Sequence, residues 1–211
     1  MKYKCIIFDC DGILVDSELI SNQVIVDLSN ELGANITIEY AIKNYAGTSL
    51  GYITQDLEDR SQIKVPDSFR DQYRERTYEA FQNELKPIEG IKELLTSIKI
   101  PFCVASNGPL HKMRLNLTVT QLIDQLEGNL FSAYEIERWK PDPALFLHAA
   151  SKMGFKANEC AVIEDSLSGV KAAISGGFDV YGFTQAHNEE AFKKEGAIVF
   201  NKMNQLYELL E

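Results

Sequence analysis

The fold is decided by the stretch Cys5-Ile6-Ile7-Phe8-Asp9-Cys10-Asp11-Gly12, in which an apolar run ends abruptly in two acids. The apolar run at residues 3–8 predicts a strand covered on both faces, as in a parallel sheet. One strand cannot be stable alone, so it must pair with strands from later in the chain. The segments that follow it therefore determine the architecture.

Residues 16–84 carry a helical pattern throughout. Apolar side chains recur at helical spacing from Leu19 onward, and Gly33 is typical of a helix end. Further helices are expected at residues 38–45, 51–61 and 66–85. No alternation typical of a strand interrupts this block, and residues 86–90 (Lys-Pro-Ile-Glu-Gly) indicate a linker.

After Gly90 the pattern alternates between strands and helices. Helices are expected at residues 91–98, from Pro109, and at 143–153 and 167–175, and strands at 101–105, 130–132, 160–163, 180–183 and 197–200. Such alternation predicts a parallel sheet covered by helices on both faces. The sequence therefore predicts an α/β fold, with a Rossmann-like parallel-sheet core of residues 1–15 and 87–211 and an inserted α-helical cap of residues 16–86.

The charge balance narrows the function classes. The 211 residues include 21 Lys and Arg against 31 Asp and Glu, a net charge of −10, which argues against non-specific nucleic-acid binding. The longest stretches without a charged residue, 44–55 and 100–111, fall short of the roughly 20 apolar residues that a membrane span needs. We expect a cytoplasmic protein with neither a nucleic-acid nor a membrane partner.

Four cysteines are present, and none has the spacing of a zinc site. Cys5, Cys103 and Cys160 each lie in or beside a short apolar run, where a free thiol behaves as a small buried hydrophobic group. We expect reduced, buried thiols in all three.

Four polar motifs fall at or near the carboxyl ends of predicted strands, the edge where open parallel sheets bind ligands. Each alone has an ordinary interpretation as a turn, a helix cap or a solvated loop. Their joint occurrence at one sheet edge is what indicates a site. The motifs are Asp9-Cys10-Asp11-Gly12, Ser106-Asn107-Gly108-Pro109, Trp139-Lys140-Pro141-Asp142-Pro143 and Glu164-Asp165-Ser166.

These residue types are suited to one chemistry. Asp9, Asp11 and Asp165 would gather three acids, which is costly unless a cation neutralises them. Carboxylates without nearby His or Cys suit a hard cation, and Mg²⁺ is the usual partner of substrate phosphate. Ser106, the helix opening near Pro109 and the cationic Lys140 could hold an anion. The combination predicts phosphoryl transfer.

The four motifs resemble those of the haloacid dehalogenase (HAD) superfamily, and the resemblance covers essentially the whole chain. The helical insertion is similar to the C1 cap of that family. The resemblance implies a phosphatase in which Asp9 is the nucleophile that forms an aspartyl-phosphate. It further implies that Asp11 protonates the leaving oxygen and then deprotonates water. Asp9, the backbone carbonyl of Asp11, Asp165 and, through water, Glu164 would bind Mg²⁺, while Ser106, the amide of Asn107 and Lys140 would hold the phosphate.

The insertion lacks two groups found in the β-phosphoglucomutase branch of the family. Ser21 stands where that branch has a His, and the stretch Ala46-Gly47-Thr48-Ser49-Leu50 lacks its Arg. A mutase must retain its phosphate, so these differences favour simple hydrolysis. The stretch 131–145 is similar to a bacterial subgroup that includes 6-phosphogluconate phosphatase.

Several alternatives stay open at this point. The favoured function is hydrolysis of a small sugar or sugar-acid phosphate, with 6-phosphogluconate as one candidate and residues 45–50 as a candidate substrate loop. That loop could equally be a plain turn between helices. A β-phosphoglucomutase-like phosphomutase and a non-catalytic module that senses phosphate esters are the alternatives. The expected partner is a small phosphorylated metabolite, and the expected state is a monomer or weak homo-oligomer.

Overall fold

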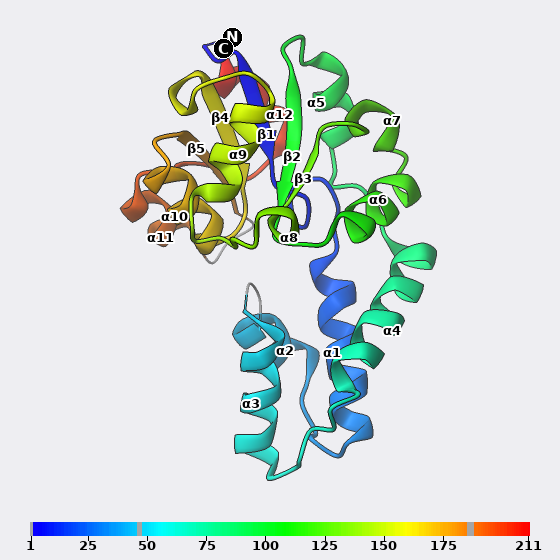
Figure 1. Ribbon diagram of the computed structural model, residues 1–211. Coiled ribbons are helices and arrows are strands. Elements are labelled where there is room, and N and C mark those ends of the chain that lie inside the picture. Colours follow the sequence, from blue (N-terminus) through cyan, green and yellow to red (C-terminus); the bar gives the residue numbers. More distant parts are fainter. Residues whose placement is uncertain (1, 46–47, 185–187) are drawn as a thin grey trace. The chain divides into compact units, whose positions relative to one another are not determined.

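The computed structural model describes residues 2–45, 48–184 and 188–211. The chain divides into two compact units (Figure 1), one formed by Met1–Asp16 with Lys86–Glu211 and the other by Ser17–Leu85. The second unit is therefore an insertion that begins shortly after the first strand.

The first unit contains a six-stranded sheet in which every neighbouring pair is parallel, in the order β3-β2-β1-β4-β5-β6. The N-terminal strand lies inside this sheet, between strands from the middle and the later part of the chain. This confirms the predicted α/β class. The strands are β1 (Cys5–Phe8), β2 (Phe102–Ser106), β3 (Leu130–Ser132), β4 (Cys160–Glu164), β5 (Asp179–Phe183) and β6 (Ile198–Phe200).

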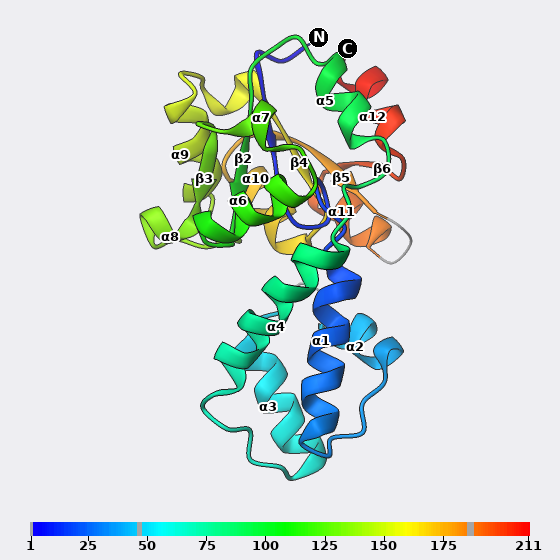
Figure 2. The same cartoon turned by 90° about the vertical axis from the view of Figure 1, so that its right-hand side faces the viewer.

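Helices cover both faces of the sheet. Apolar residues of α9 and α10 pack on one face against alternate residues of β1, β2 and β4. Helices α5 and α12 contact each other and lie on the other side (Figure 2). The helices of this unit are α5 (Ile91–Ser97), α6 (Leu110–Val119), α7 (Ile123–Leu126), α8 (Ala133–Ile136), α9 (Ala144–Lys152), α10 (Leu167–Ser175), α11 (Glu189–Glu195) and α12 (Met203–Leu210), with a 3₁₀ turn at Ala157–Glu159.

The central strands β1 and β4 are buried along their whole length, as a strand covered on both faces requires. Cys5, Cys103 and Cys160 are free and buried on adjacent strands, as predicted. The strand order switches direction between β1 and β4, because β2 and β3 follow on one side of β1 and β5 and β6 follow on the far side of β4. Ligands bind at such a switch point in open parallel sheets.

The regular secondary structure described in the second unit is all helical. Its helices are α1 (Glu18–Glu31), α2 (Ile38–Tyr45), α3 (Leu50–Ser61) and α4 (Phe69–Glu84). They bury one apolar cluster that includes Ile25, Leu28, Leu57 and Phe69. Helix α4 begins later than residue 66, because the amide of Phe69 closes a turn onto the carbonyl of Pro66. No described helix of the chain is long and apolar enough to cross a membrane.

Candidate active site

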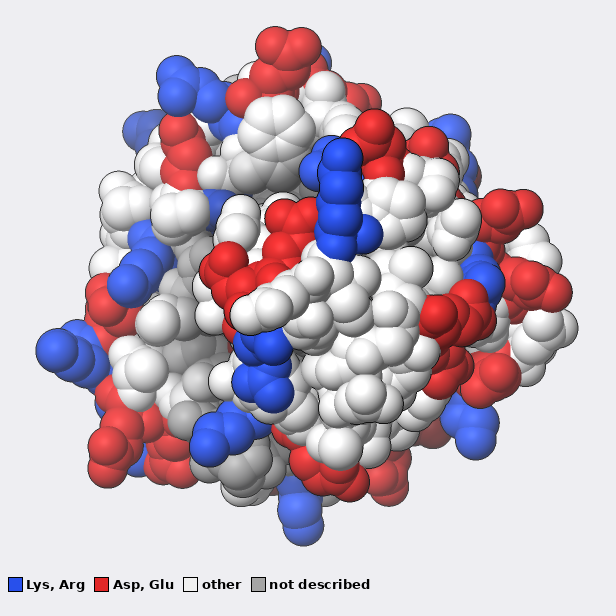
Figure 3. All heavy atoms as spheres, turned by 90° about the horizontal axis from the view of Figure 1, so that it is seen from below, with Lys and Arg blue, Asp and Glu red and all other residues white. Residues whose placement is uncertain are grey.

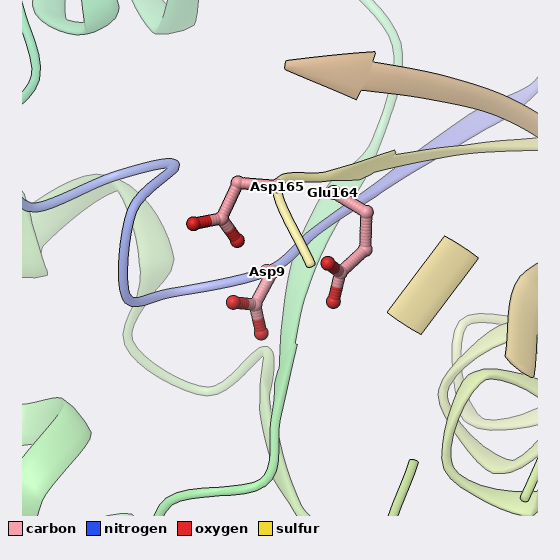
Figure 4. Close-up of side chains that lie close together, drawn as sticks. All are labelled: Asp9, Glu164 and Asp165. Carbon is pink, nitrogen blue, oxygen red and sulfur yellow. The ribbon is translucent and has the colours of Figure 1, made fainter. Parts of the chain in front are cut away.

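Three carboxylates meet at the carboxyl end of the sheet. Asp9 follows β1, Glu164 ends β4 and Asp165 follows it, and one oxygen of each lies within 4.8 Å of the others. Figure 4 shows the three side chains facing a common space. They meet because Phe8 and Ile163 are partners in the β1–β4 pair, and the amide of Asp9 donates to the carbonyl of Ile163 at 2.9 Å.

Lys140 places a buried cation within this cluster. Its Nζ lies 2.6 Å from Asp9 Oδ1 and 2.6 Å from Glu164 Oε1, and its side chain is only 3% exposed. Burial lowers the pKa of Lys140, but the two carboxylates raise it further, so the net pKa is above the ordinary value. Lys140 is therefore a cation whose charge is offset by two acids.

The same buried environment shifts the pKa of Asp9. Burial raises the pKa of Asp9 to about 7, while Lys140 acts to lower it and Glu164 acts to raise it. Any further cation that reaches the cluster would therefore stabilise the charged form of Asp9. The predicted residues Asp9, Lys140, Glu164 and Asp165 are thus brought to one place.

Glu164 is anchored on both of its oxygens. Oε2 accepts hydrogen bonds from the amide of Ser166 at 2.7 Å and from its hydroxyl at 2.9 Å, while Oε1 accepts from Lys140. Gly169 leaves the space that this carboxylate fills, because a Cβ there would lie 1.9 Å from Glu164 Oε1. The glycine in this motif is therefore required by packing against the acid.

We expect Gly169→Ala to destabilise the protein by about 1–3 kcal/mol, because the added methyl group must displace a buried, anchored carboxylate. Urea unfolding measures the change. Gly51→Ala is the matched control, since Gly51 is also helical and its Cβ would meet no atom closer than 3.8 Å. Unfolding of both variants at the wild-type urea midpoint would show that Glu164 can move without cost.

Asp11 lies in a tight turn beside Asp165. The turn needs Gly12, whose φ is +78° and whose Cβ would come within 1.8 Å of Asp165 Oδ2. The amide of Gly12 donates to the carbonyl of Val15 at 2.9 Å, which closes the turn. Asp11 was predicted to lie with the other acids, and its turn lies against Asp165.

Two of the predicted phosphate-binding residues lie at the carboxyl end of β2, where Ser106 is the last residue of the strand and Asn107 follows it. Ser106 is buried, and its hydroxyl accepts from the amide of Gly108 at 3.0 Å. Asn107 Oδ1 accepts from the backbone amide of Lys140 at 2.9 Å, so Asn107 holds the lysine loop. This second role of Asn107 was not predicted, because it depends on two segments meeting in the fold.

Two partners of Asp11 on helix α6 were not predicted from the sequence. Lys112 Nζ lies 2.7 Å from Asp11 Oδ2, and Asn116 Nδ2 lies 3.3 Å from Asp11 Oδ1. A signal was present in the sequence, since the two residues are spaced i and i+4 on the helix that opens after the Ser106 motif.

The candidate substrate loop at residues 45–50 is described only in part, and Ala46 and Gly47 lie outside the described residues. Ser49 caps α3 by accepting from the amide of Tyr52, and the Thr48 hydroxyl donates to the carbonyl of Tyr45 at 2.9 Å. Tyr45 in turn donates to Asp56 at 2.7 Å. The described part of this loop is thus tied into the helical unit.

Surface charge agrees with the composition. Acidic and basic side chains are interspersed on the face drawn in Figure 3, and the described residues there form no continuous basic area.

Comparisons with known proteins agree with the geometry. The family model of haloacid dehalogenase-like hydrolases matches residues 6–183. The 6-phosphogluconate phosphatase of Escherichia coli (strain K12) is 33% identical over 209 residues, which cover 99% of this chain and 95% of that protein.

Solved structures are similar over the same length. A conserved haloacid dehalogenase-like protein from Agrobacterium tumefaciens has a TM-score of 0.91 at 31% identity, covering 99% of this chain and 97% of the other. A HAD family hydrolase from Deinococcus radiodurans, solved with bound phosphate and sodium, has a TM-score of 0.86 at 26% identity, covering 99% and 95%.

Proposed function

Because the chain belongs to the haloacid dehalogenase-like hydrolase family, we propose that it hydrolyses small sugar or sugar-acid phosphates with Mg²⁺ through an aspartyl-phosphate on Asp9. The broader assignment, a phosphoric monoester hydrolase, follows from its phosphatase relatives. One observation carries the proposed mechanism. Asp9, Asp165 and Lys140 converge at the carboxyl edge of the sheet, where a carboxylate nucleophile, a cation site and a phosphate-binding cation are needed together.

The donor set suits a hard divalent cation. The cluster of Asp9, Glu164 and Asp165 offers only carboxylate oxygens, and the first two are buried. We propose that Asp9, Asp165 and the backbone carbonyl of Asp11 hold Mg²⁺, with Glu164 acting through water. When bound, the ion would neutralise the acids and polarise the phosphoryl group.

Each side chain of the site has its own role in the proposed reaction. A carboxylate oxygen of Asp9 attacks phosphorus, forming a P–O bond as the bond to the leaving oxygen breaks. Asp11 gives its proton to that oxygen. In the second step Asp11 accepts a proton from the water whose oxygen bonds to phosphorus, while the bond from phosphorus to Asp9 breaks and inorganic phosphate leaves. The Ser106 hydroxyl, the Asn107 amide and Lys140 stabilise charge on the phosphoryl oxygens.

The proposed substrate is a small polyol or sugar-acid phosphate such as 6-phosphogluconate. Two considerations support it: the full-length relative of that name, and the absence of the mutase-branch His at Ser21. We propose that the helical unit Ser17–Leu85 is the cap that selects the substrate. The domain limits of residues 1–15, 16–86 and 87–211, the cytoplasmic location and the monomeric or weakly associating state stay predictions from sequence.

The test is phosphate release with Mg²⁺ from a panel of 6-phosphogluconate, hexose and pentose phosphates, glycerol phosphates and β-glucose 1-phosphate, repeated with EDTA. We expect metal-dependent release, with the highest kcat/KM on a sugar-acid or sugar phosphate. Release that EDTA leaves unchanged would remove the metal from the proposal. Conversion of β-glucose 1-phosphate to the 6-phosphate would favour a mutase, and binding without turnover would favour a sensing module.

Metal binding can also be measured without turnover. We expect Mg²⁺ to raise the Tm of the wild type, by the equivalent of about 2.7 kcal/mol at a hundredfold excess over Kd. In Asp165→Asn the increase should be largely lost, whereas the exposed Asp124→Asn on α7 should keep it. An equal rise in all three proteins would place the ion elsewhere.

A further inference from the structure

Helix α6 holds the Asp11 carboxylate from two successive turns. Lys112 Nζ contacts Asp11 Oδ2 at 2.7 Å, and Asn116 Nδ2 contacts Oδ1 at 3.3 Å, so each oxygen of the carboxylate accepts from a different side chain. The two donors are four residues apart and therefore lie on the same face of the helix. A two-point hold of this kind restricts the rotation of a short side chain.

The contacts of Asp11 with Lys112 and Asn116 are largely shielded from solvent. Asn116 is fully buried, and the side chains of Lys112 and Asp11 are 21% and 30% exposed. Gly108 lies beside this contact, since a Cβ there would touch it at ordinary van der Waals distances, 3.5 Å from Lys112 Cδ and 4.0 Å from Asp11 Oδ2. The same Cβ would lie 3.4 Å from Ser106 Oγ, so the held carboxylate is next to the proposed phosphate-binding loop.

The two lysines of the site contact different acids. Lys140 contacts Asp9 and Glu164, whereas Lys112 contacts Asp11. Without Lys112, Asp11 would keep the neighbouring negative charges of Asp9 and Asp165 and lose the cation that draws it toward α6. Its side chain would then be free to turn away from the loop.

We propose that Lys112 is a positioning residue, which with Asn116 aims the Asp11 carboxyl at the bridging oxygen of the substrate phosphate. This inference rests on the proposed function and adds to it a residue outside the four predicted motifs. Lys112 acts through Asp11 rather than through contact with the phosphoryl group.

Substrates with different leaving groups distinguish a positioning role of Lys112 from a purely structural one. An alkyl phosphate such as 6-phosphogluconate leaves as a basic alkoxide and needs the proton of Asp11, whereas p-nitrophenolate leaves readily without one. Misplacing Asp11 should therefore lower kcat/KM for the alkyl ester and leave the aryl ester nearly unchanged. Because kcat/KM covers the steps up to departure of the leaving group, it excludes the later hydrolysis of the phosphoaspartate.

The experiment compares Lys112→Met, which keeps the length of the side chain without its charge, with Lys112→Arg and wild type. For Lys112→Met we expect kcat/KM to fall about 100-fold for the alkyl ester and less than about threefold for p-nitrophenyl phosphate. Lys112→Arg should recover most of the loss. Arg114→Met is the matched control on the same helix, where it removes only an exposed ion pair with Glu127.

A double variant tests whether the effect passes through Asp11. In an Asp11→Asn background, Lys112→Met should add little to the loss. Equal losses on both esters, or a full further loss in that background, would overturn the inference and assign Lys112 to direct phosphate binding. Unchanged activity of Lys112→Met on both esters would overturn it as well. A wild type that hydrolyses neither ester would instead contradict the proposed function, and this inference with it.

Discussion

Asp9→Asn is expected to lower turnover at least about 10⁴-fold, the order of loss found when the nucleophile of a catalytic set is removed. An amide of the same shape cannot form the acyl phosphate. The fold should persist, because Lys140 keeps its contact with Glu164 and the backbone hydrogen bond of residue 9 to Ile163 is unchanged.

The measurement is kcat on the best substrate of the panel, together with Tm. Asp124→Asn is the matched control, since it makes the same chemical change on an exposed position of α7. Near wild-type turnover in Asp9→Asn would remove Asp9 as the nucleophile. Loss of activity accompanied by loss of the folded state would show only that the residue is structural.

Lys140→Met is expected to affect both stability and turnover. Lys140 lies between two buried carboxylates, and removing one partner of a buried ion pair costs about 3–5 kcal/mol. For a chain of this length that corresponds to a fall in Tm of about 10 °C. Turnover should be lost in the same variant, because the phosphoryl oxygens lose their cation.

The loss of stability in Lys140→Met should depend on pH. Burial raises the pKa of Asp9 to about 7 and Lys140 opposes that rise, so in Lys140→Met the pKa should rise further. A carboxyl group whose pKa is raised by folding stabilises the folded state at low pH, and this contribution is lost as the pH rises through the folded pKa. The variant should therefore be most destabilised above pH 7 and closer to wild type near pH 5.

A second substitution tests whether the unpaired carboxylates cause the loss of stability. Glu164→Gln in the Lys140→Met background should recover part of the stability, because one of the two orphaned carboxylates is neutralised. Lys152→Met, at an exposed position near the end of α9, is the control for loss of a lysine. If Lys140→Met unfolds like wild type at all pH values, the buried charges are not coupled as described.

Much of the fold could be predicted from local pattern. The apolar run before Asp9 and the alternation after Gly90 were sufficient for the α/β class, because a parallel sheet requires both continuous apolar strands and intervening helices. Element ends were less predictable. Helix α4 begins at Phe69 rather than at residue 66, since a turn formed through Pro66 comes first.

The site was predictable where topology alone brings residues together. Asp9 and Glu164 meet because each lies at the carboxyl end of one of two adjacent parallel strands. The contacts of Lys112, Asn116 and Asn107 could not be predicted in this way. They depend on how helix α6 meets the Asp11 turn and how the Asn107 loop meets the Lys140 loop, and single-sequence patterns carry little information about such packing.

The most direct measurement is a rapid acid quench of the wild type with Mg²⁺ and substrate, followed by mass spectrometry of the peptide that contains Asp9. We expect a phosphoryl group on Asp9 that forms before free phosphate accumulates and is absent from Asp9→Asn. Phosphate release during turnover with Asp9 unmodified at every time point, or with the phosphoryl group on another residue, would contradict it.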